Sequence, residues 1–170
     1  MPVDFKDYSI EVKAAINDTT IDWLRTWSNE IASQAKDKCK MDGDAGTQLR
    51  KSYRPVVNES KGEALIGSPL ESAYWEEFGT GEHALDKSMS RKGWWVYTPG
   101  NPGPEGSQSG VYANQEEAES MARHIMKKYK KPAVATNGRD PQYTLQNAFK
   151  RVAPKAKADL EAKLMGGLGK

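Results

Sequence analysis

Residues 12–40 read VKAAINDTTIDWLRTWSNEIASQAKDKCK, and this stretch decides the fold. Its apolar residues recur every three or four positions, which is the spacing of one helix face. They are Val12, Ile16, Trp23, Leu24, Trp27, Ile31 and Ala35. Gly43 and Gly46 follow the pattern and are expected to end it. The stretch therefore predicts one long amphipathic helix whose tryptophan stripe packs on the rest of the protein.

A β-hairpin is expected directly after this helix. Residues 49–58 have the composition of a strand, and Pro55 makes it an edge or bulged strand because proline cannot donate to a ladder. Residues 58–62 form a turn and residues 64–66 a return strand. Residues 94–98, rich in aromatic and β-branched side chains, predict another strand. The period of residues 72–78 fits a helical turn or a strand equally well.

The last third of the sequence predicts a loop and two helices. Residues 99–111 are dominated by Gly, Pro, Ser, Asn and Gln and are expected to form a flexible loop. An inserted helix at about 114–131 begins at a capping-box-like pair, Asn114 and Glu117. Its apolar stripe comprises Ala118, Met121, Ala122, Ile125, Met126 and Tyr129. A final helix at 144–164 carries Leu145, Ala148, Phe149, Val152, Ala156, Leu160 and Leu164 on one face. Pro154 should kink this helix, and Gly166-Gly167 should end it.

These elements predict an α+β fold, in which a small antiparallel sheet with a hairpin packs against long N-terminal and C-terminal helices. The 170 residues are expected to form a single domain, 1–170, because that length is enough to bury a core. Five tryptophans and seven tyrosines favour a folded chain. The N-terminal residues lack the basic and apolar regions of a signal peptide, and no apolar run approaches the ~20 residues of a membrane span. Synthesis in a cytoplasm and no membrane partner are therefore expected.

The sequence offers little that indicates catalysis. Cys39, His83 and His124 are far apart and lack the paired spacing of zinc ligands. The glycine-rich stretch 43–47 lacks the lysine of a phosphate-binding loop. Glu76 and Glu77 are adjacent, and adjacent carboxylates usually point in different directions. The prediction is a protein that is not an enzyme and has no cofactor or metal.

Charge is unevenly distributed along the chain. Residues 123–170 carry a net charge of about +9, whereas residues 1–122 carry about −7. Such asymmetry indicates a contact with an acidic partner, either nucleic acid or the acidic part of a neighbouring copy. Basic and aromatic residues occur together at 91–95 and 127–131, as they do in proteins that bind single strands. The alternative interpretation is a strand with one tryptophan in the core and lysines that solvate a helix end.

Residues 74–81, YWEEFGTG, carry the most specific pattern in the chain. Gly79 and Gly81 are expected to supply positive φ or a close backbone approach. Tyr74 and Phe78 would share a face if the segment is helical. Glu77 would accept hydrogen bonds from loop amides or pair with Arg50. The segment is either a fold-specific loop or part of an interface.

Four segments, in order, resemble one family. They are residues 46–52 with Leu49 and Arg50, residues 74–81 with Tyr74, Glu77, Phe78, Gly79, Thr80 and Gly81, residues 91–97, and residues 136–143 followed by Leu145, Ala148 and Phe149. The family is the gene-product-ten-like group of tail-completion or head–tail joining (neck) proteins of long-tailed bacteriophages. This chain departs from it at Gln142-Tyr143, where the family usually has Pro-Phe, and in its larger insertion between 99 and 131.

The resemblance implies a virion structural protein, a neck or tail-completion subunit that forms a ring at the head–tail junction and is made in the bacterial host cytoplasm. Its expected partners are copies of itself and other phage neck and tail proteins, with non-specific contact to DNA in the channel. Lys150, Arg151 and Lys155 are the expected charged ring contacts. The alternatives are a head-closure or tail-terminator protein of the same particle, or a cellular nucleic-acid-binding module.

Overall fold

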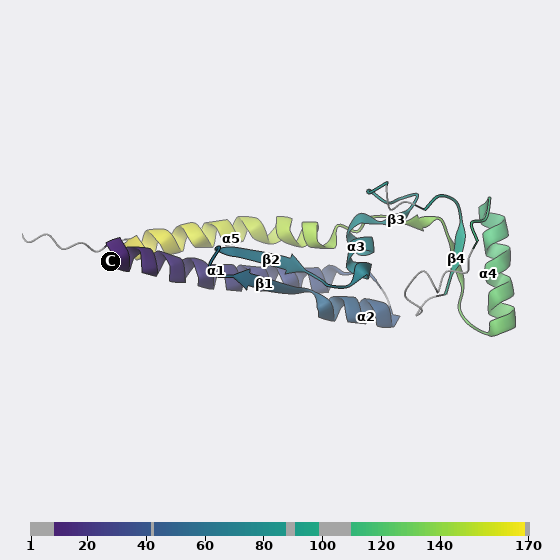
Figure 1. Ribbon diagram of the computed structural model, residues 1–170, viewed down its shortest axis with the longest axis horizontal. Helices are drawn as coiled ribbons and strands as arrows, with labels where there is room; N and C mark the ends of the chain where they lie inside the picture. The colour runs from purple at the N-terminus through teal and green to yellow at the C-terminus, as the bar shows by residue number, and fades with distance from the viewer. Residues whose placement is uncertain (1–8, 42, 88–90, 99–109, 169–170) are drawn as a thin grey trace, which may run out of the picture. The chain divides into compact units, whose positions relative to one another are not determined.

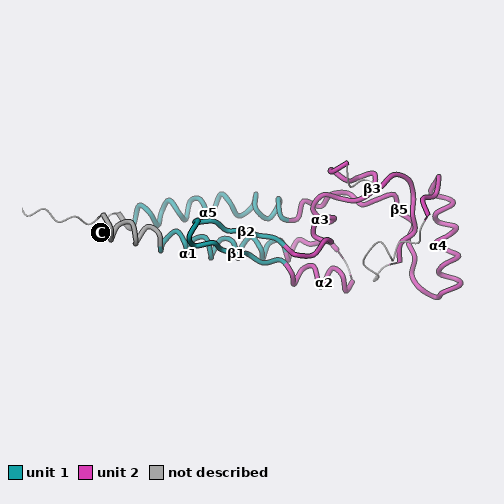
Figure 2. The backbone as a smooth tube through the Cα atoms, in the orientation of Figure 1, with its two compact units in different colours: residues 1–35, 53–67, 145–170 teal, residues 36–52, 68–144 magenta. Residues whose placement is uncertain are grey.

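The computed structural model describes residues 9–41, 43–87, 91–98 and 110–168. The chain divides into two compact units, each assembled from segments far apart in the sequence (Figure 2). Unit 1 contains residues 1–35, 53–67 and 145–170, and unit 2 contains residues 36–52 and 68–144. The α+β class is confirmed, with long helices near both ends of the chain and small antiparallel sheets (Figure 1). The expectation of a single domain stays a prediction.

Unit 1 contains most of helices α1 (Ser9–Lys38) and α5 (Thr144–Leu168), together with the hairpin of strands β1 (Arg54–Asn58) and β2 (Glu63–Gly67). The strands are antiparallel, with Val56 opposite Leu65. The turn forms because Gly62 adopts φ 63° and the Asn58 carboxamide oxygen accepts hydrogen bonds from the Ser60 hydroxyl and the Lys61 amide. The hairpin predicted from the sequence is thus present.

Two tryptophans join the helices of unit 1. The Trp23 indole nitrogen donates to the Ala156 carbonyl at 2.7 Å, and the Trp27 indole nitrogen donates to Asp159 Oδ2 at 2.8 Å. Ile31, Ala32, Val152 and Ala156 are buried on the same two helices. The tryptophan stripe therefore faces α5, although both indole rings are only half-buried.

Unit 2 begins with a helix where a strand entry was expected. Residues 43–52 form α2 (Gly43–Ser52), so Gly43 and Gly46 start a new helix, and residues 49–52 are not part of a strand. Gly43 has φ 70°, and Gly46 lies so close to the Met41 carbonyl that a Cβ there would clash. Gly46 and Leu49 are buried three residues apart, which is a helical spacing. Gly43 and Gly46 therefore do not only end the first helix, as their sequence position predicts, but allow a tight turn between two helices.

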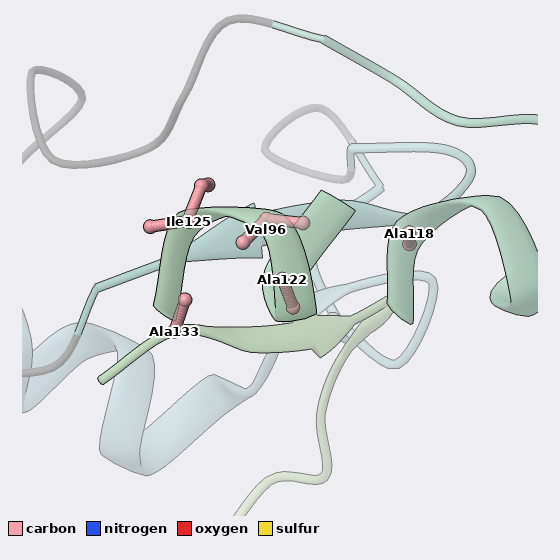
Figure 3. Packing of buried hydrophobic residues seen from close by; sticks show 5 residues of the cluster. All are labelled: Val96, Ala118, Ala122, Ile125 and Ala133. Atoms are coloured by element: carbon pink, nitrogen blue, oxygen red, sulfur yellow. The ribbon is translucent and has the colours of Figure 1, made fainter. Parts of the chain in front are cut away.

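Among the described residues of unit 2, two further helices and two two-stranded sheets follow. Helix α3 (Glu71–Phe78) resolves the ambiguity at 72–78 in favour of a helix. Strand β3 (Thr80–Gly81) pairs with β6 (Gly138–Arg139), and β4 (Trp95–Tyr97) pairs with β5 (Val134–Thr136), all antiparallel. Helix α4 (Gln115–Tyr129) covers one face of β4–β5, where Val96, Ala118, Ala122, Ile125 and Ala133 form a buried cluster (Figure 3).

The C-terminal expectations are confirmed in part. The Asn114 side chain accepts from the Glu117 amide and caps α4 as predicted, but Met126 and Tyr129 are exposed rather than part of the buried stripe. Helix α5 passes through Pro154 and Gly166-Gly167 to Leu168, so the glycines do not end it, and Phe149 is exposed. Glycine costs a helix only about 1 kcal/mol, which tertiary context overrides. Of the expected loop at 99–111, residues 99–109 lie outside the described residues.

Candidate functional site: the motif segment and the α5 cations

The carbonyl groups at the end of α3 are all satisfied from within unit 2. A helix leaves its last four carbonyls without helical partners. Here the Gly79 amide donates to Trp75 and the Leu85 amide to Phe78, while the amides of Gln142 and Tyr143 donate to Glu76 and Glu77. The motif segment is therefore fixed by a stretch more than sixty residues further along the chain.

A buried carboxylate lies at the centre of this arrangement. Glu76 has no exposed surface. Its Oε1 accepts from the Lys40 backbone amide at 2.8 Å and from the Thr144 hydroxyl at 3.4 Å. Its Oε2 lies 3.0 Å from the Arg139 guanidinium, an ion pair without an aligned hydrogen bond among the described residues. An isolated buried charge is strongly unfavourable, so Arg139 and the two donors are what allow Glu76 to be buried.

The adjacency of Glu76 and Glu77 in the sequence did not predict a structural role for Glu76, which the hydrogen bonds and the ion pair of its carboxylate now show. Both side chains are buried, and Glu76 joins α3, the segment after α1, β6 and the first residue of α5. A sequence signal existed, because Ala73 and Glu76 lie three residues apart on a helix face and Arg139 lies in another of the family-like segments. The missing information was the pairing of segments sixty residues apart.

Gly79, Thr80 and Gly81 pass close to the backbone of β6. Gly79 and Gly81 have φ 77° and 61°, and a Cβ on either would collide with the carbonyl of Arg139 or Asn137, respectively. The Thr80 hydroxyl accepts a hydrogen bond from the Arg139 amide at 3.0 Å. The prediction of positive φ and close backbone approach is confirmed, and it explains why side chains larger than hydrogen are excluded at both glycines.

Tyr74 and Phe78 share one face of α3, as their spacing predicted. Their ring centroids are 4.7 Å apart with the planes tilted by 47°. The Tyr74 hydroxyl donates to Asp86 Oδ2 at 2.9 Å, and this hydrogen bond raises the pKa of Tyr74 above its ordinary value. This pair orders the segment after β3 rather than pointing into a cavity.

Glu82 was not singled out from the sequence, yet it holds three segments together. Its carboxylate accepts from the Gly93 amide at 3.0 Å and from the Asn137 side chain at 3.2 Å. The Glu82 amide also donates to the Asn137 carbonyl at 2.9 Å. Because Glu82 directly follows the motif, it links the motif to Gly93, which precedes β4, and to Asn137, which follows β5.

Leu49 and Arg50 lie in α2 and act within unit 2. Leu49 is fully buried. Arg50 donates to the carbonyls of Met41, at 2.8 Å, and Cys39, at 3.4 Å, and so satisfies backbone groups after the end of α1. The predicted pairing of Glu77 with Arg50 stays a prediction.

Lys150, Arg151 and Lys155 are exposed on α5 in unit 1, as an interface role requires. Arg151 and Lys155 line a shallow groove of about 380 Å³ between α1 and α5, opposite Trp27, Glu30 and Gln34. Lys150 donates to the Gln146 side chain at 3.2 Å. Lys150, Arg151 and Lys155 lie in unit 1, whereas the motif residues lie in unit 2. The two sets therefore belong to different compact units.

The groups with catalytic potential are few among the described residues. No cluster of three or more His, Cys, Asp or Glu side chains there is placed to hold a metal ion. Cys39 is buried, and desolvation raises the pKa of its thiol, which keeps it protonated and poorly nucleophilic. His83 Nδ1 lies 2.7 Å from an Asp140 carboxylate oxygen at the surface. None of the described helices has the length and apolar character needed to cross a membrane.

Comparisons with protein-family models, with curated proteins and with solved structures find no match for this chain. In the motif segment, the polar groups of Glu76, Thr80 and Tyr74 are bonded to other parts of unit 2. These bonds fix the backbone of the motif segment within unit 2.

Proposed function

We propose that this protein is a virion structural subunit, a neck or tail-completion protein that forms a ring at the head–tail junction of a long-tailed bacteriophage. The observation that carries the proposal is the incomplete hairpin of unit 1. Val56 and Leu65 lie directly opposite each other in the register, and they are 60% and 75% exposed. An apolar cross-strand pair at the centre of an open face is characteristic of a surface that another protein covers.

The hairpin also leaves its strand edges available. Sheet β1–β2 has two strands, and in the described part of the chain no third strand pairs with either of them. Unpaired edges offer backbone donors and acceptors to another chain. Pro55 removes one donor in β1, so the β2 edge is the better one for pairing. The open face and the open edge together support assembly with another subunit.

Unit 1 carries a second, different surface in the groove that Arg151 and Lys155 line. An apolar hairpin face and a basic groove are unlike each other, so self-association through them is heterologous rather than isologous. Heterologous contacts form a closed ring when the repeated rotation from one subunit to the next returns to the first subunit. This supports a ring built from copies of the chain, with other phage neck and tail proteins above and below it.

The first test is the assembly state of the purified protein. Native mass spectrometry and electron microscopy should show a closed ring. Val56→Asp with Leu65→Asp should abolish it while leaving the melting temperature of the subunit nearly unchanged, because both side chains are already exposed. Val111→Asp with Leu85→Asp is the matched control, since these side chains are also exposed but lie in unit 2. A wild-type monomer at all concentrations would contradict the ring.

Charge reversal tests the second surface. Lys150, Arg151 and Lys155 changed to Glu should impair ring formation without unfolding the subunit, and the wild-type ring should weaken as salt is raised. A ring that is unaffected by both would remove the groove from the interface.

The biological test is removal of the gene from the phage. DNA-filled heads and separate tails that fail to join are expected. Infectious particles without the protein would reject a joining role. A block before heads or tails are built would assign the protein to an earlier step, and failure confined to tail length or head closure would favour a tail-terminator or head-closure protein.

A further inference from the structure

The C-terminal end of α4 and the two residues directly after it carry a concentrated positive charge. Residues 123–131 contain five cations and no carboxylate. Four of them, Lys127, Lys128, Lys130 and Lys131, are exposed and are called the α4 lysine cluster below. Within the described residues none of the four forms a salt bridge. The dipole of α4 favours cations at this end, but only by about 1 kcal/mol at a surface, and four neighbouring lysines repel one another.

The backbone of Lys130, within the cluster, adopts an unusual conformation. Lys130 is the C-cap of α4 and adopts the left-handed conformation, with φ 54° and ψ 29°. Glycine or asparagine normally occupies this position because other side chains are strained there. The lysine at this position therefore carries a conformational cost that glycine would avoid.

Aromatic side chains flank the cluster. Tyr129 is 53% exposed, and the Lys128 ammonium group lies over its ring at 5.1 Å from the centroid. The next strand, β5, begins at Val134, which pairs with Tyr97, and that tyrosine is 40% exposed. Exposed tyrosines beside lysines suit a phosphate backbone, because tyrosine hydroxyls and lysines both donate to phosphate oxygens.

An acidic patch on a second copy is the competing partner, and the structure disfavours it. The densest run of carboxylates in the chain is at the other end of α4, at residues 116–119. Glu117 accepts from the Ala113 amide and the Asn114 side chain, and Glu119 pairs with Arg123 and accepts from Gln115. Because Glu119 is already paired with Arg123, the two remaining negative charges of this run cannot neutralise four lysines.

We propose that the α4 lysine cluster binds the phosphate backbone of duplex nucleic acid, without reading its sequence. Lysines are flexible point charges and suit positioning on phosphates rather than recognition of base edges. Duplex DNA carries one negative charge per about 1.7 Å of its axis, a density that matches a run of lysines. This inference concerns a surface of unit 2 and does not depend on ring formation by unit 1.

The test is binding of the full chain to a fluorescent random-sequence DNA duplex, measured by anisotropy over a range of salt concentrations. Wild-type protein should bind with an affinity that falls steeply with salt and is the same for an unrelated duplex sequence. Changing all four lysines of the cluster to Gln should lower the slope of log K against log salt by about 3 to 4, or roughly one per lost phosphate contact. The affinity should fall more than tenfold.

The matched control removes the same number of charges elsewhere in unit 2, with Lys36, Lys38, Lys40 and Lys51 changed to Gln. Its slope should change by less than about 1. Equal effects in the two variants would show a general charge effect and overturn the proposal. Absence of DNA binding by wild type would also overturn it, and if the cluster variant then changed the assembly state, the surface would be a protein contact.

Lys130→Gly separates a structural role from a binding role. Glycine relieves the left-handed strain, so the melting temperature should rise whichever role the lysine has. If Lys130 contacts phosphate, the salt slope should also fall by about 1. An unchanged slope in this variant, together with an unchanged slope in the fourfold variant, would leave only the helix cap and reject the proposal.

Discussion

The β1–β2 hairpin and the β4–β5 sheet are both two-stranded and antiparallel, yet they differ in how deeply their strand residues are buried. In β4–β5, Val96 is fully buried because α4 lies against the sheet with Ala118, Ala122 and Ile125. In β1–β2 no strand residue is fully buried, and the outer face exposes Val56 and Leu65. An isolated hairpin is marginal in water. Unit 2 thus has a buried core on β4–β5, whereas the outer face of the hairpin in unit 1 stays exposed, and this exposure is the feature that supports the proposed contact with another subunit.

The largest expected effect is in unit 2, at Glu76. Glu76→Ala leaves the Lys40 amide, the Thr144 hydroxyl and the Arg139 guanidinium without their acceptor. Removing one member of a buried ion pair costs about 3–5 kcal/mol, and the partial exposure of Arg139 puts the expected loss near the lower limit. Chemical denaturation of the variant should show it, with Glu71→Ala, at an exposed site on the same helix, as the control. A loss below about 1 kcal/mol would mean that Glu76 does not hold unit 2 together.

Two isoleucines compare the sheets directly. Ile125→Ala removes a buried side chain from the covered sheet and should cost about 3 kcal/mol, within the usual range for a buried isoleucine. Ile66→Ala in β2, where the side chain is only half-buried, should cost about 1 kcal/mol in the monomer. Urea denaturation of both variants at low protein concentration measures the difference. Equal losses would mean that the hairpin is as well covered as β4–β5.

Trp27 tests how firmly α1 is held to α5. Trp27→Ala removes a half-buried indole and its hydrogen bond to Asp159, so a loss of about 2–3 kcal/mol is expected, less than for a fully buried tryptophan. Trp27→Phe keeps most of the packing and should cost about 1 kcal/mol for the lost hydrogen bond. Thermal unfolding distinguishes the two. If Phe were as damaging as Ala, the hydrogen bond rather than the packing would dominate.

The smallest effect is expected from pH. Hydrogen bonds from Trp27 and Lys163 lower the pKa of Asp159 below its ordinary value of 3.8. A carboxyl group with a lowered folded-state pKa stabilises the fold above its unfolded pKa, and this stabilisation is lost as the pH falls through the folded pKa. Melting temperatures of wild type should therefore fall more steeply than those of Asp159→Asn below about pH 4. Parallel curves would show that Asp159 does not contribute.

The parts of the fold that could be predicted from the sequence are those specified by local signals. Asn58 and Gly62 specify the hairpin turn, Asn114 and Glu117 specify the start of α4, and Gly79 indicates a positive φ. Each of these acts through atoms only a few residues apart. The positive φ of Gly79 and Gly81, where the chain passes close to β6, could be predicted for the same reason.

Long-range pairing could not be predicted. Helix α2 was missed because Gly43 and Gly46 resemble breakers until the close approach to Met41 is known. The Glu76–Arg139 pair joins residues that no local pattern connects. The exposure of Phe149 was also missed, because helical spacing identifies a face without showing how far its partner extends.

The closure of β3 on β6 has a consequence for how this chain can change over evolutionary time. The chain leaves the paired strands β3 and β6 at Glu82 and returns to them at Asn137. The Glu82 amide donates a hydrogen bond of 2.9 Å to the Asn137 carbonyl. For a loop whose ends are fixed in this way, doubling its length adds only about 0.6 kcal/mol of closure entropy. The stretch between them can therefore lengthen, shorten or acquire a helix such as α4 while the pairing of β3 with β6 keeps its geometry. Related chains should differ most in length between these two residues, and an alignment with its insertions concentrated elsewhere would contradict this expectation.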